Sequence, residues 1–382
     1  MKEKKDKDRL IFISIIISVF VLFTFFAIKA IISQNKEKKG NGSVEASIEE
    51  TDLRSEDTST LYEGDDLVSD EDASETETVY DTATGYLMYK GIYYAIPGSD
   101  GEPEYNEENA YSQSCNLAAA DYYDIDMENL DIPDYIEFNG NKFSITSILH
   151  DAFSYDTMLT GVKIASGISA IGDNAFMGCD SINAIEFGSQ SQDGGSGTDI
   201  ENSSLVSIGA HVFDGCTALK TITVPDSVTA IGDDAFNACT GLISITLPSN
   251  LLTIGTEAFF GCSQLTSVSI PSKCTSLSEG MFTNCESLSE VDLGDKLQLI
   301  GDSAFWACHS LNTVTIPSTV IYIGTDAFYD TGLKSVIIKA DSITLGDDIF
   351  DYSNDLETII VPKTCQKYYE SLFSGYNVEE SE

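Results

Sequence analysis

The sequence is poor in basic residues. It has 20 lysines and arginines against 62 aspartates and glutamates among 382 residues, so its formal net charge is −42. Nucleic-acid binding needs clustered Lys and Arg to neutralise phosphates, and charge-driven adhesion to anionic lipid needs a basic face. The composition therefore argues against nucleic acid as a partner and disfavours electrostatic binding to a lipid surface.

The motifs of common catalytic and cofactor sites are also absent. No C-x-x-C, H-E-x-x-H, G-x-S-x-G, phosphate-loop or G-x-G-x-x-G dinucleotide pattern occurs, and His150, His211 and His309 belong to no such motif. We therefore predict that the protein is not an enzyme and has no catalytic, cofactor-binding or metal-binding residues. An exported hydrolase using a carboxylate pair is the enzymatic alternative.

An apolar run stands at the N-terminus. Residues 10–28 carry no charge, and after Lys29 the chain stays apolar to Ile32. About 20 apolar residues can cross a bilayer as a helix, whereas the apolar core of a signal peptide usually has about 7–15. We predict a single-pass signal anchor over residues 10–32, a cytoplasmic tail over 1–9 and the bulk of the protein outside the cell. A secreted protein released by signal cleavage is the alternative.

Two different segments follow this run. Residues 33–82 are predicted to be an acidic, disordered stalk, since Ser, Thr, Asp and Glu without a sustained apolar period cannot bury enough surface to fold. A loose calcium-binding tract is a weaker interpretation, because no Asp-x-Asp-x-Asp-Gly loop is present. Residues 83–145 are predicted to be an N-terminal cap with strands, in which Asn139-Gly140 forms a hairpin turn.

The remainder of the sequence repeats with a period of 23 residues. Successive anchor phenylalanines are separated by 23, 37, 23, 23, 23, 23, 23 and 22 residues, and a Gly/Ser-rich insertion at 188–204 accounts for the long spacing. A fixed period of about 20–30 residues is typical of a solenoid. The anchors are Phe153, Phe176, Phe213, Phe236, Phe259, Phe282, Phe305, Phe328 and Phe350.

Each position of the unit has a structural interpretation. In the stretch IGDDAFNACTGLISITLP (231–248), Ile245 and Leu247 alternate as the inward residues of a strand. Asp233 is expected to cap a short helical turn that places Phe236 in the core, and Asp234 is expected to be solvated. The cysteine three residues after the anchor is interpreted as a small buried core residue, with disulfides between neighbouring repeats as the alternative. This position holds Cys179, Cys216, Cys239, Cys262, Cys285 and Cys308.

These units resemble the BspA-like leucine-rich-repeat family. The pattern I-G-x-x-A-F-x-x-C-x-x-L-x-x-I-x-I-P, as in IGDSAFWACHSLNTVTIP (300–317), carries the resemblance. It implies an α/β leucine-rich-repeat solenoid over residues 146–362, with a parallel concave sheet and short helical turns on the convex side. Residues 363–382 then form a C-terminal cap and tail. The family implies a surface protein of bacteria or parasitic protists that acts in adhesion. Departures at Leu277-Ser278, Thr331 and Ser342 predict local irregularity.

The residues flanking the inward strand positions form a candidate binding face. Most are Ser or Thr, interrupted by an acidic pair, and stacked repeats would align them on one extended surface. The alternative is that Ser and Thr simply suit exposed strands. The residues are Thr221, Thr223, Ser244, Thr246, Ser267, Ser269, Glu290, Asp292, Thr313 and Thr315.

A second candidate surface is an aromatic edge one residue after the anchor. It comprises Phe260, Trp306 and Tyr329, and exposed aromatic residues in a row are typical of binding hot spots. Packing against a neighbouring loop is the alternative. We therefore predict a membrane-anchored surface protein that binds an extracellular protein or polysaccharide. A structural envelope protein that self-assembles through its repeats is the second hypothesis.

Overall fold

The computed structural model describes residues 78–81, 86–89, 92–95, 114–120, 128–188 and 203–381. All of them belong to one compact unit, Asp70–Glu382. The predicted tail (1–9) and signal anchor (10–32), and all but a few residues of the predicted stalk (33–82), lie outside these ranges. Within the ranges, no helix has the length and apolar character needed to span a membrane.

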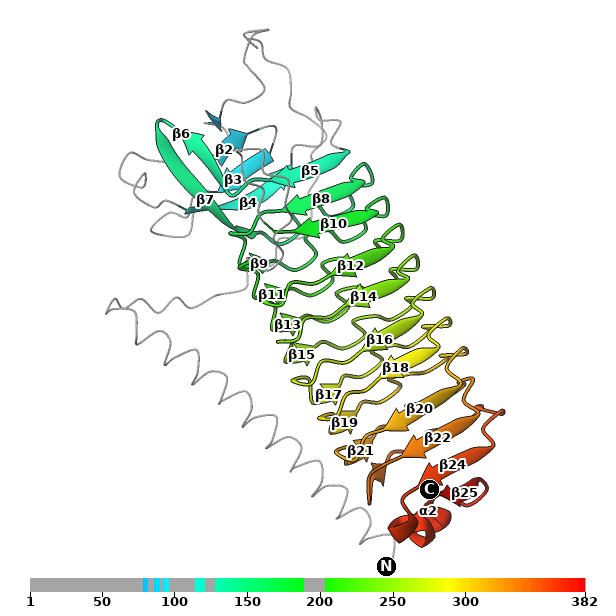
Figure 1. Cartoon of the computed structure of the whole chain (residues 1–382). Helices are drawn as coiled ribbons and strands as arrows, with labels where there is room; N and C mark the ends of the chain where they lie inside the picture. Colours follow the sequence, from blue (N-terminus) through cyan, green and yellow to red (C-terminus); the bar gives the residue numbers. More distant parts are fainter. Residues whose placement is uncertain are drawn as a thin grey trace, which may run out of the picture. The chain divides into compact units, whose positions relative to one another are not determined.

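The repeats form a solenoid with two series of parallel strands, a long-strand series and a short-strand series (Figure 1). The predicted parallel sheet corresponds to the long-strand series. This series consists of β5 (Asn129–Ile132), β8 (Gly161–Ile164), β10 (Ala184–Phe187), β12 (Thr221–Thr223), β14 (Ser244–Thr246), β16 (Ser267–Ser269), β18 (Glu290–Asp292), β20 (Thr313–Ile316), β22 (Ser335–Ile338) and β24 (Thr358–Val361).

The short-strand series runs along the other side of each repeat. Its strands have two residues each, of which the second is buried in most repeats. They are β9 (Ala170–Ile171), β11 (Ser207–Ile208), β13 (Ala230–Ile231), β15 (Thr253–Ile254), β17 (Ser276–Leu277), β19 (Leu299–Ile300), β21 (Tyr322–Ile323) and β23 (Thr344–Leu345).

Strand register follows the sequence period. Ile222 of β12 lies opposite Ile245 of β14, and Ile231 of β13 lies opposite Ile254 of β15. Each residue therefore lies beside the residue at the same position of the next repeat. A residue type that recurs in the sequence forms a continuous row in the structure. The insertion predicted at 188–204 leaves the register intact, because β9 still pairs with β11 across it.

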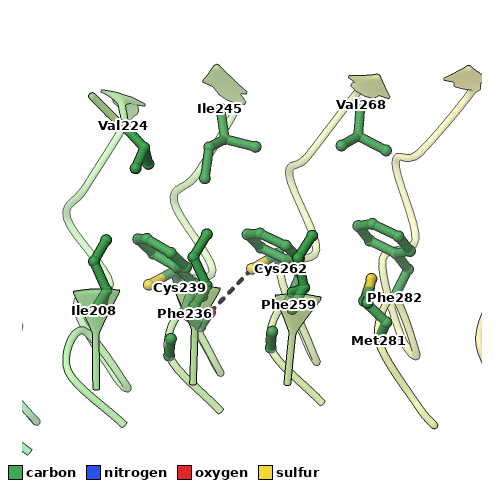
Figure 2. Close-up of a cluster of buried hydrophobic side chains, with 14 of the residues drawn as sticks. Ile208, Val224, Phe236, Cys239, Ile245, Phe259, Cys262, Val268, Met281 and Phe282 are labelled. Atoms are coloured by element: carbon green, nitrogen blue, oxygen red, sulfur yellow. Dashed lines mark hydrogen bonds between the residues drawn. The ribbon is translucent and has the colours of Figure 1, made fainter. Parts of the chain in front are cut away.

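The core contains a stack of the anchor phenylalanines, as predicted. All nine side chains are buried, and successive ring centroids lie between 5.1 Å (Phe305–Phe328) and 5.8 Å (Phe328–Phe350) apart. Figure 2 shows part of this stack, with the aliphatic side chains of both strand series packed against it. Most rings are nearly parallel, as for Phe153 and Phe176 at an interplanar angle of 5°.

The segments that carry the anchor phenylalanines are non-helical turns, whereas the sequence analysis predicted short helical turns. Asp234 and Ala238 have φ angles of 53° and 52°, in the left-handed region that a right-handed helix excludes. The N–H of Phe236 donates to the carbonyl of Ala258 in the next repeat at 2.9 Å. Backbone bonds thus run between repeats here, and the helices among the described residues are η3 (Lys363–Cys365) and α2 (Gln366–Leu372).

Close stacking depends on the glycine that follows most of the short strands; Ser278 stands at this position after β17. A Cβ added to Gly232 would lie 2.6 Å from the backbone nitrogen of Ala210 and 2.6 Å from the carbonyl carbon of Gly209 in the preceding repeat. Backbone atoms cannot yield as a flexible side chain can, so a larger residue at Gly232 would force the two repeats apart; at Ser278, the one non-glycine at this position after the short strands, β17 is not paired with β15. The glycine of the I-G pair is therefore explained by close backbone contact between neighbouring repeats.

Antiparallel strands precede the solenoid. β6 (Tyr135–Phe138) and β7 (Asn141–Ile148) form a hairpin, and the predicted turn is confirmed, with positive φ at Asn139 and Gly140. β7 then pairs in parallel with β9, which joins the hairpin to the short-strand series. Further strands of this sheet are β1 (Val79–Asp81), β2 (Tyr86–Tyr89), β3 (Ile92–Ala95) and β4 (Ser114–Ala120).

At the C-terminal end, α2 covers the core. Tyr369 and Phe373 are buried, and the Phe373 ring lies 5.9 Å from that of Phe350, the last anchor. The Tyr369 hydroxyl donates to the carbonyl of Ala340 at 2.8 Å. β25 (Asn377–Glu380) then adds a final parallel strand beside β24.

The three positions that depart from the repeat pattern differ in their effect on the solenoid. At Ser342 the neighbouring Ile343 supplies the buried aliphatic side chain. At Leu277-Ser278 the predicted irregularity is present: β17 pairs with β19 but not with β15, and the Ser278 hydroxyl donates to the Ile254 carbonyl at 2.6 Å. Thr331 ends the cysteine row, and its hydroxyl lies 2.7 Å from that of Ser353.

Candidate binding surfaces

The long-strand face brings together all ten residues predicted to form the binding face. Every one of them is exposed, because the strands alternate and the inward partners fill the core. Register places Ser267 beside both Ser244 and Glu290, and Ser269 beside Asp292. The residues lie on β12, β14, β16, β18 and β20.

A hollow of about 640 Å³ opens on this face over β14, β16 and β18. Its lining includes Thr246, Ser269, Glu290 and Asp292, and the half-buried Leu247 and Pro271 add apolar surface to it. No lysine or arginine lines it. The hollow therefore offers hydroxyls and carboxylates beside some apolar surface, which suits a ligand with hydrogen-bond donors or positive charge.

Three polar residues that line the hollow were missed by the sequence interpretation: Asp226, Ser249 and Ser272. Asp226 follows Pro225 at the end of β12, and its Oδ1 accepts the Ser249 N–H of the next repeat at 2.8 Å. The sequence signal was an aspartate directly after the strand-ending proline. On the opposite rim, Asp292 accepts the N–H of Gly294 at 3.0 Å and lies 3.3 Å from the Ser269 hydroxyl. These bonds fix two carboxylates of the hollow.

The aromatic edge is only partly as predicted. Trp306 and Tyr329 are in edge-to-face contact, with ring centroids 5.7 Å apart. Phe260 is half-buried and is separated from them by a repeat that carries the buried Thr283 at this position. Tyr352, which the sequence interpretation missed, extends the contact with its ring 4.9 Å from that of Tyr329. Tyr352 lies two residues after its anchor, so the one-residue pattern could not find it.

The cysteine row is buried and its thiols are free. This supports the interpretation of a core position over that of disulfides. Burial raises the pKa of Cys179 to about 12 and holds that of Cys239 well above its ordinary value of 9.0. The thiolate form needed for nucleophilic chemistry is therefore strongly disfavoured.

Asp233 and Asp234 have roles that differ from those predicted. Asp233 caps the next repeat: its Oδ1 accepts the N–H of Thr256 at 2.7 Å. Asp234 is not simply solvated, because it accepts a hydrogen bond from Asn237 at 2.7 Å and pairs with His211 at 3.7 Å. Thr256 and His211 each lie 23 positions from their partner aspartate, and the repeat period alone does not predict which atoms meet across that distance.

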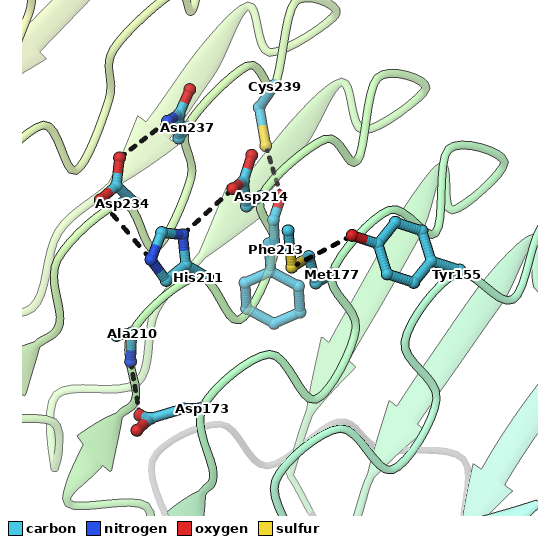
Figure 3. Close-up of polar contacts among 10 residues, drawn as sticks. All are labelled: Tyr155, Asp173, Met177, Ala210, His211, Phe213, Asp214, Asp234, Asn237 and Cys239. Carbon is cyan, nitrogen blue, oxygen red and sulfur yellow. Dashed lines mark hydrogen bonds and ion pairs between the residues drawn. The ribbon is translucent and has the colours of Figure 1, made fainter. Parts of the chain in front are cut away.

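His211 lies between two carboxylates (Figure 3). Its Nδ1 is 3.1 Å from Asp214 Oδ2, and its Nε2 is 3.7 Å from Asp234 Oδ2. Burial raises the pKa of Asp214, with His211 acting in the opposite direction. Cys239 is not a partner of this group, because its thiol bonds the Phe213 carbonyl. Within the described ranges no three His, Cys, Asp or Glu side chains are arranged to hold a metal ion.

The repeat unit decides the family. The BspA type Leucine rich repeat region matches residues 122–198, 194–312 and 282–382, in six copies. The chain belongs to the BspA-type leucine-rich-repeat family. No curated protein gives a significant match to this BspA-type chain.

Solved structures of other repeat proteins are similar to this BspA-type protein. A leucine-rich-repeat protein of T. pallidum (TpLRR) is 25% identical, with 58% of this chain and 88% of that chain covered and a TM-score of 0.46. A leucine-rich cell surface protein of Faecalibacterium prausnitzii is 18% identical, with 81% and 96% covered and a TM-score of 0.29. The pneumococcal vaccine antigen PcpA is 13% identical, with 78% and 99% covered and a TM-score of 0.36.

Proposed function

We propose that this BspA-type protein is a non-enzymatic cell-surface protein that binds an extracellular protein or polysaccharide through its long-strand face. Residues 10–32 would anchor it in the membrane, with the solenoid outside the cell. The observation that carries the proposal is the acidic hollow over β14, β16 and β18, set in a row of exposed Ser and Thr.

The chemistry of the hollow limits the kind of ligand. Glu290, Asp292 and Asp226 place three carboxylates around it, and hydroxyls of Ser267 and Ser269 lie between them. Carboxylates and hydroxyls accept hydrogen bonds from ammonium, guanidinium or sugar hydroxyl groups. A basic protein segment or a neutral polysaccharide meets this requirement, whereas a polyanion would be repelled.

A glycan and protein array tests the proposal with the full chain and two matched double variants. Glu290→Ser with Asp292→Ser removes two charges from the hollow, and we expect it to abolish or strongly weaken binding. Asp180→Ser with Glu286→Ser removes two exposed charges outside the hollow and should leave binding intact. Equal binding by both double variants would contradict the proposal.

The second hypothesis is self-assembly through the repeats. The structure of the C-terminal end argues against it. There Tyr369 of α2 and the following Phe373 are buried over the core, so the stack of core side chains does not end in an open layer on which another copy could continue it. β25 is a further strand, and its outer residues include Glu379 and Glu380; charged edge strands resist pairing with other chains. Size-exclusion chromatography with light scattering tests this point, and a concentration-dependent polymer would support self-assembly.

A further inference from the structure

Three aromatic side chains form a row along neighbouring repeats: the exposed Trp306 and Tyr352, with the half-buried Tyr329 between them. They contact one another, yet Trp306 is 43% and Tyr352 is 65% exposed. Packing within the described chain therefore does not account for them. We call these three residues the aromatic row.

The aromatic row lies away from the long-strand face. Trp306 stands on the turn that leads from the short strand β19 (Leu299–Ile300) to the long strand β20 (Thr313–Ile316). Tyr329 and Tyr352 occupy the corresponding turns of the next two repeats. None of the three lines the hollow over β14, β16 and β18, so an inference about this row does not depend on the proposed function.

Aspartates surround the aromatic row. Burial raises the pKa of Tyr329, and Tyr352, Asp326 and Asp330 raise it further. The pKa of Asp326 is itself raised, by burial first and then by Asp348 and other carboxylates nearby. The geometry agrees, because Asp330 directly follows Tyr329 and Asp351 directly precedes Tyr352, and the Asp330 N–H donates to the Asp351 carbonyl at 2.9 Å.

Most of these carboxylates are not neutralised. Asp330 pairs with His309 at 3.3 Å. In the ranges that the structure describes, the side chains of Asp326, Asp348 and Asp351 have no ion pair or hydrogen bond. Elsewhere in the repeats, aspartates on these turns have partners, as Asp234 has in Asn237. The row thus combines exposed aromatic faces with unpaired negative charge.

We propose that the aromatic row and its aspartates form a docking site for arginine side chains of a partner protein. A guanidinium group is planar, stacks on aromatic faces and directs its N–H donors to carboxylates at its edge. The row offers both surfaces in adjacent repeats. A lysine ammonium would be attracted by the charge but would gain less from stacking, and a neutral glycan would leave the carboxylates unneutralised.

Trp306 reports directly on this site, because it is the only tryptophan in the chain. We would titrate the full chain with an acetylated, amidated hexa-arginine peptide and record tryptophan fluorescence. A saturable change in emission is expected. Tyr352→Asn should weaken the affinity about three- to fivefold, the loss of one exposed cation–π contact. Asparagine tolerates the positive φ of 60° at this position, so the fold should be retained.

Tyr155→Asn is the matched control. Tyr155 occupies the same repeat position, with a φ of 62° and 65% exposure, but contacts Met177 instead of the aromatic row. This variant should leave the titration unchanged. An equal response to hexa-lysine, an unaltered affinity in Tyr352→Asn, or a response to maltohexaose in place of the peptide would overturn the proposal.

Discussion

The thiol of Cys239 donates a hydrogen bond to the carbonyl oxygen of Phe213, the anchor of the preceding repeat, at 3.1 Å. The other five cysteines of the row bond the preceding anchor in the same way, at 2.9 to 3.4 Å. Ser353 takes over this role in the last repeat and donates to Phe328 at 2.8 Å. The position therefore selects a small side chain with a donor.

Cys239→Ala should lower the free energy of unfolding by about 1–2 kcal/mol, because it leaves a small cavity and removes the bond to Phe213. Cys239→Ser should cost less, because a hydroxyl can donate as that of Ser353 does. Urea denaturation followed by circular dichroism measures both. Cys365→Ser, half-buried and outside the row, is the control. A serine variant less stable than the alanine variant would contradict the donor role.

Native thiol reactivity should be low. Seven of the described cysteines are buried, and burial raises the pKa of each, Cys179 to about 12. Labelling with a thiol reagent at pH 8, mapped by mass spectrometry, should therefore modify Cys365 and spare the row until the chain is unfolded. Rapid labelling of Cys239 in the native protein would show that the row opens or that its thiols are activated.

The same thiols predict a loss of stability at alkaline pH. Their folded pKa values lie above the ordinary value of 9.0, so between about pH 9 and pH 12 the unfolded chain releases protons that the folded chain retains. The free energy of unfolding must then fall as pH rises through this range. Melting temperatures recorded from pH 7 to pH 11 should drop above pH 9, and less so in Cys239→Ser.

Asp233→Ala should destabilise the protein by about 0.5–1 kcal/mol, because the Thr256 N–H loses its acceptor at an exposed site. Asp233→Asn keeps a side-chain oxygen and should retain most of the stability. Thr256→Ala is a matched control, since Thr256 occupies the same repeat position and its side chain makes no such bond in the described chain. Equal melting temperatures for Asp233→Ala and Thr256→Ala would exclude the cap between repeats.

Asp214→Asn should raise the melting temperature at pH 7. Burial raises the pKa of Asp214, so the folded protein prefers the neutral carboxyl, and the stability that this group contributes at low pH is lost as pH rises. Asparagine is neutral at every pH and can still accept a hydrogen bond from His211. The gain should shrink on acidification below about pH 4, where Asp itself becomes protonated.

The period of the sequence predicted most of the fold. Because identical positions stack, the repeat period and the alternation in the strands were enough to predict the buried anchor phenylalanines, the cysteine row and the exposed face of the long strands. The geometry of the turns was not predictable in this way. Asp233 before Ala-Phe fits a helix cap and an inter-repeat cap equally well, and the choice depends on the N–H of Thr256, which only the stacked structure brings near.

The candidate surfaces were predictable where they follow the period and not where they depart from it. The ten residues of the long-strand face occupy equivalent positions and were found together. Tyr352 was missed because it reaches Tyr329 from a different repeat position. Asp226 was missed because its side chain enters the hollow from a turn. The alternation of residues in a strand cannot predict these two contacts, because both residues lie on turns.

The bonds between repeats also determine how the solenoid would carry load. Strand pairs, turn carbonyls, aspartate caps and thiol donors all join a repeat to its immediate neighbours, so stability is distributed along the stack one interface at a time. A force that pulls the two ends apart would unfold single repeats one after another, instead of unfolding the whole domain in one step. A protein tethered at one end and holding a ligand on its side would thereby yield gradually under tension and keep its distal repeats folded.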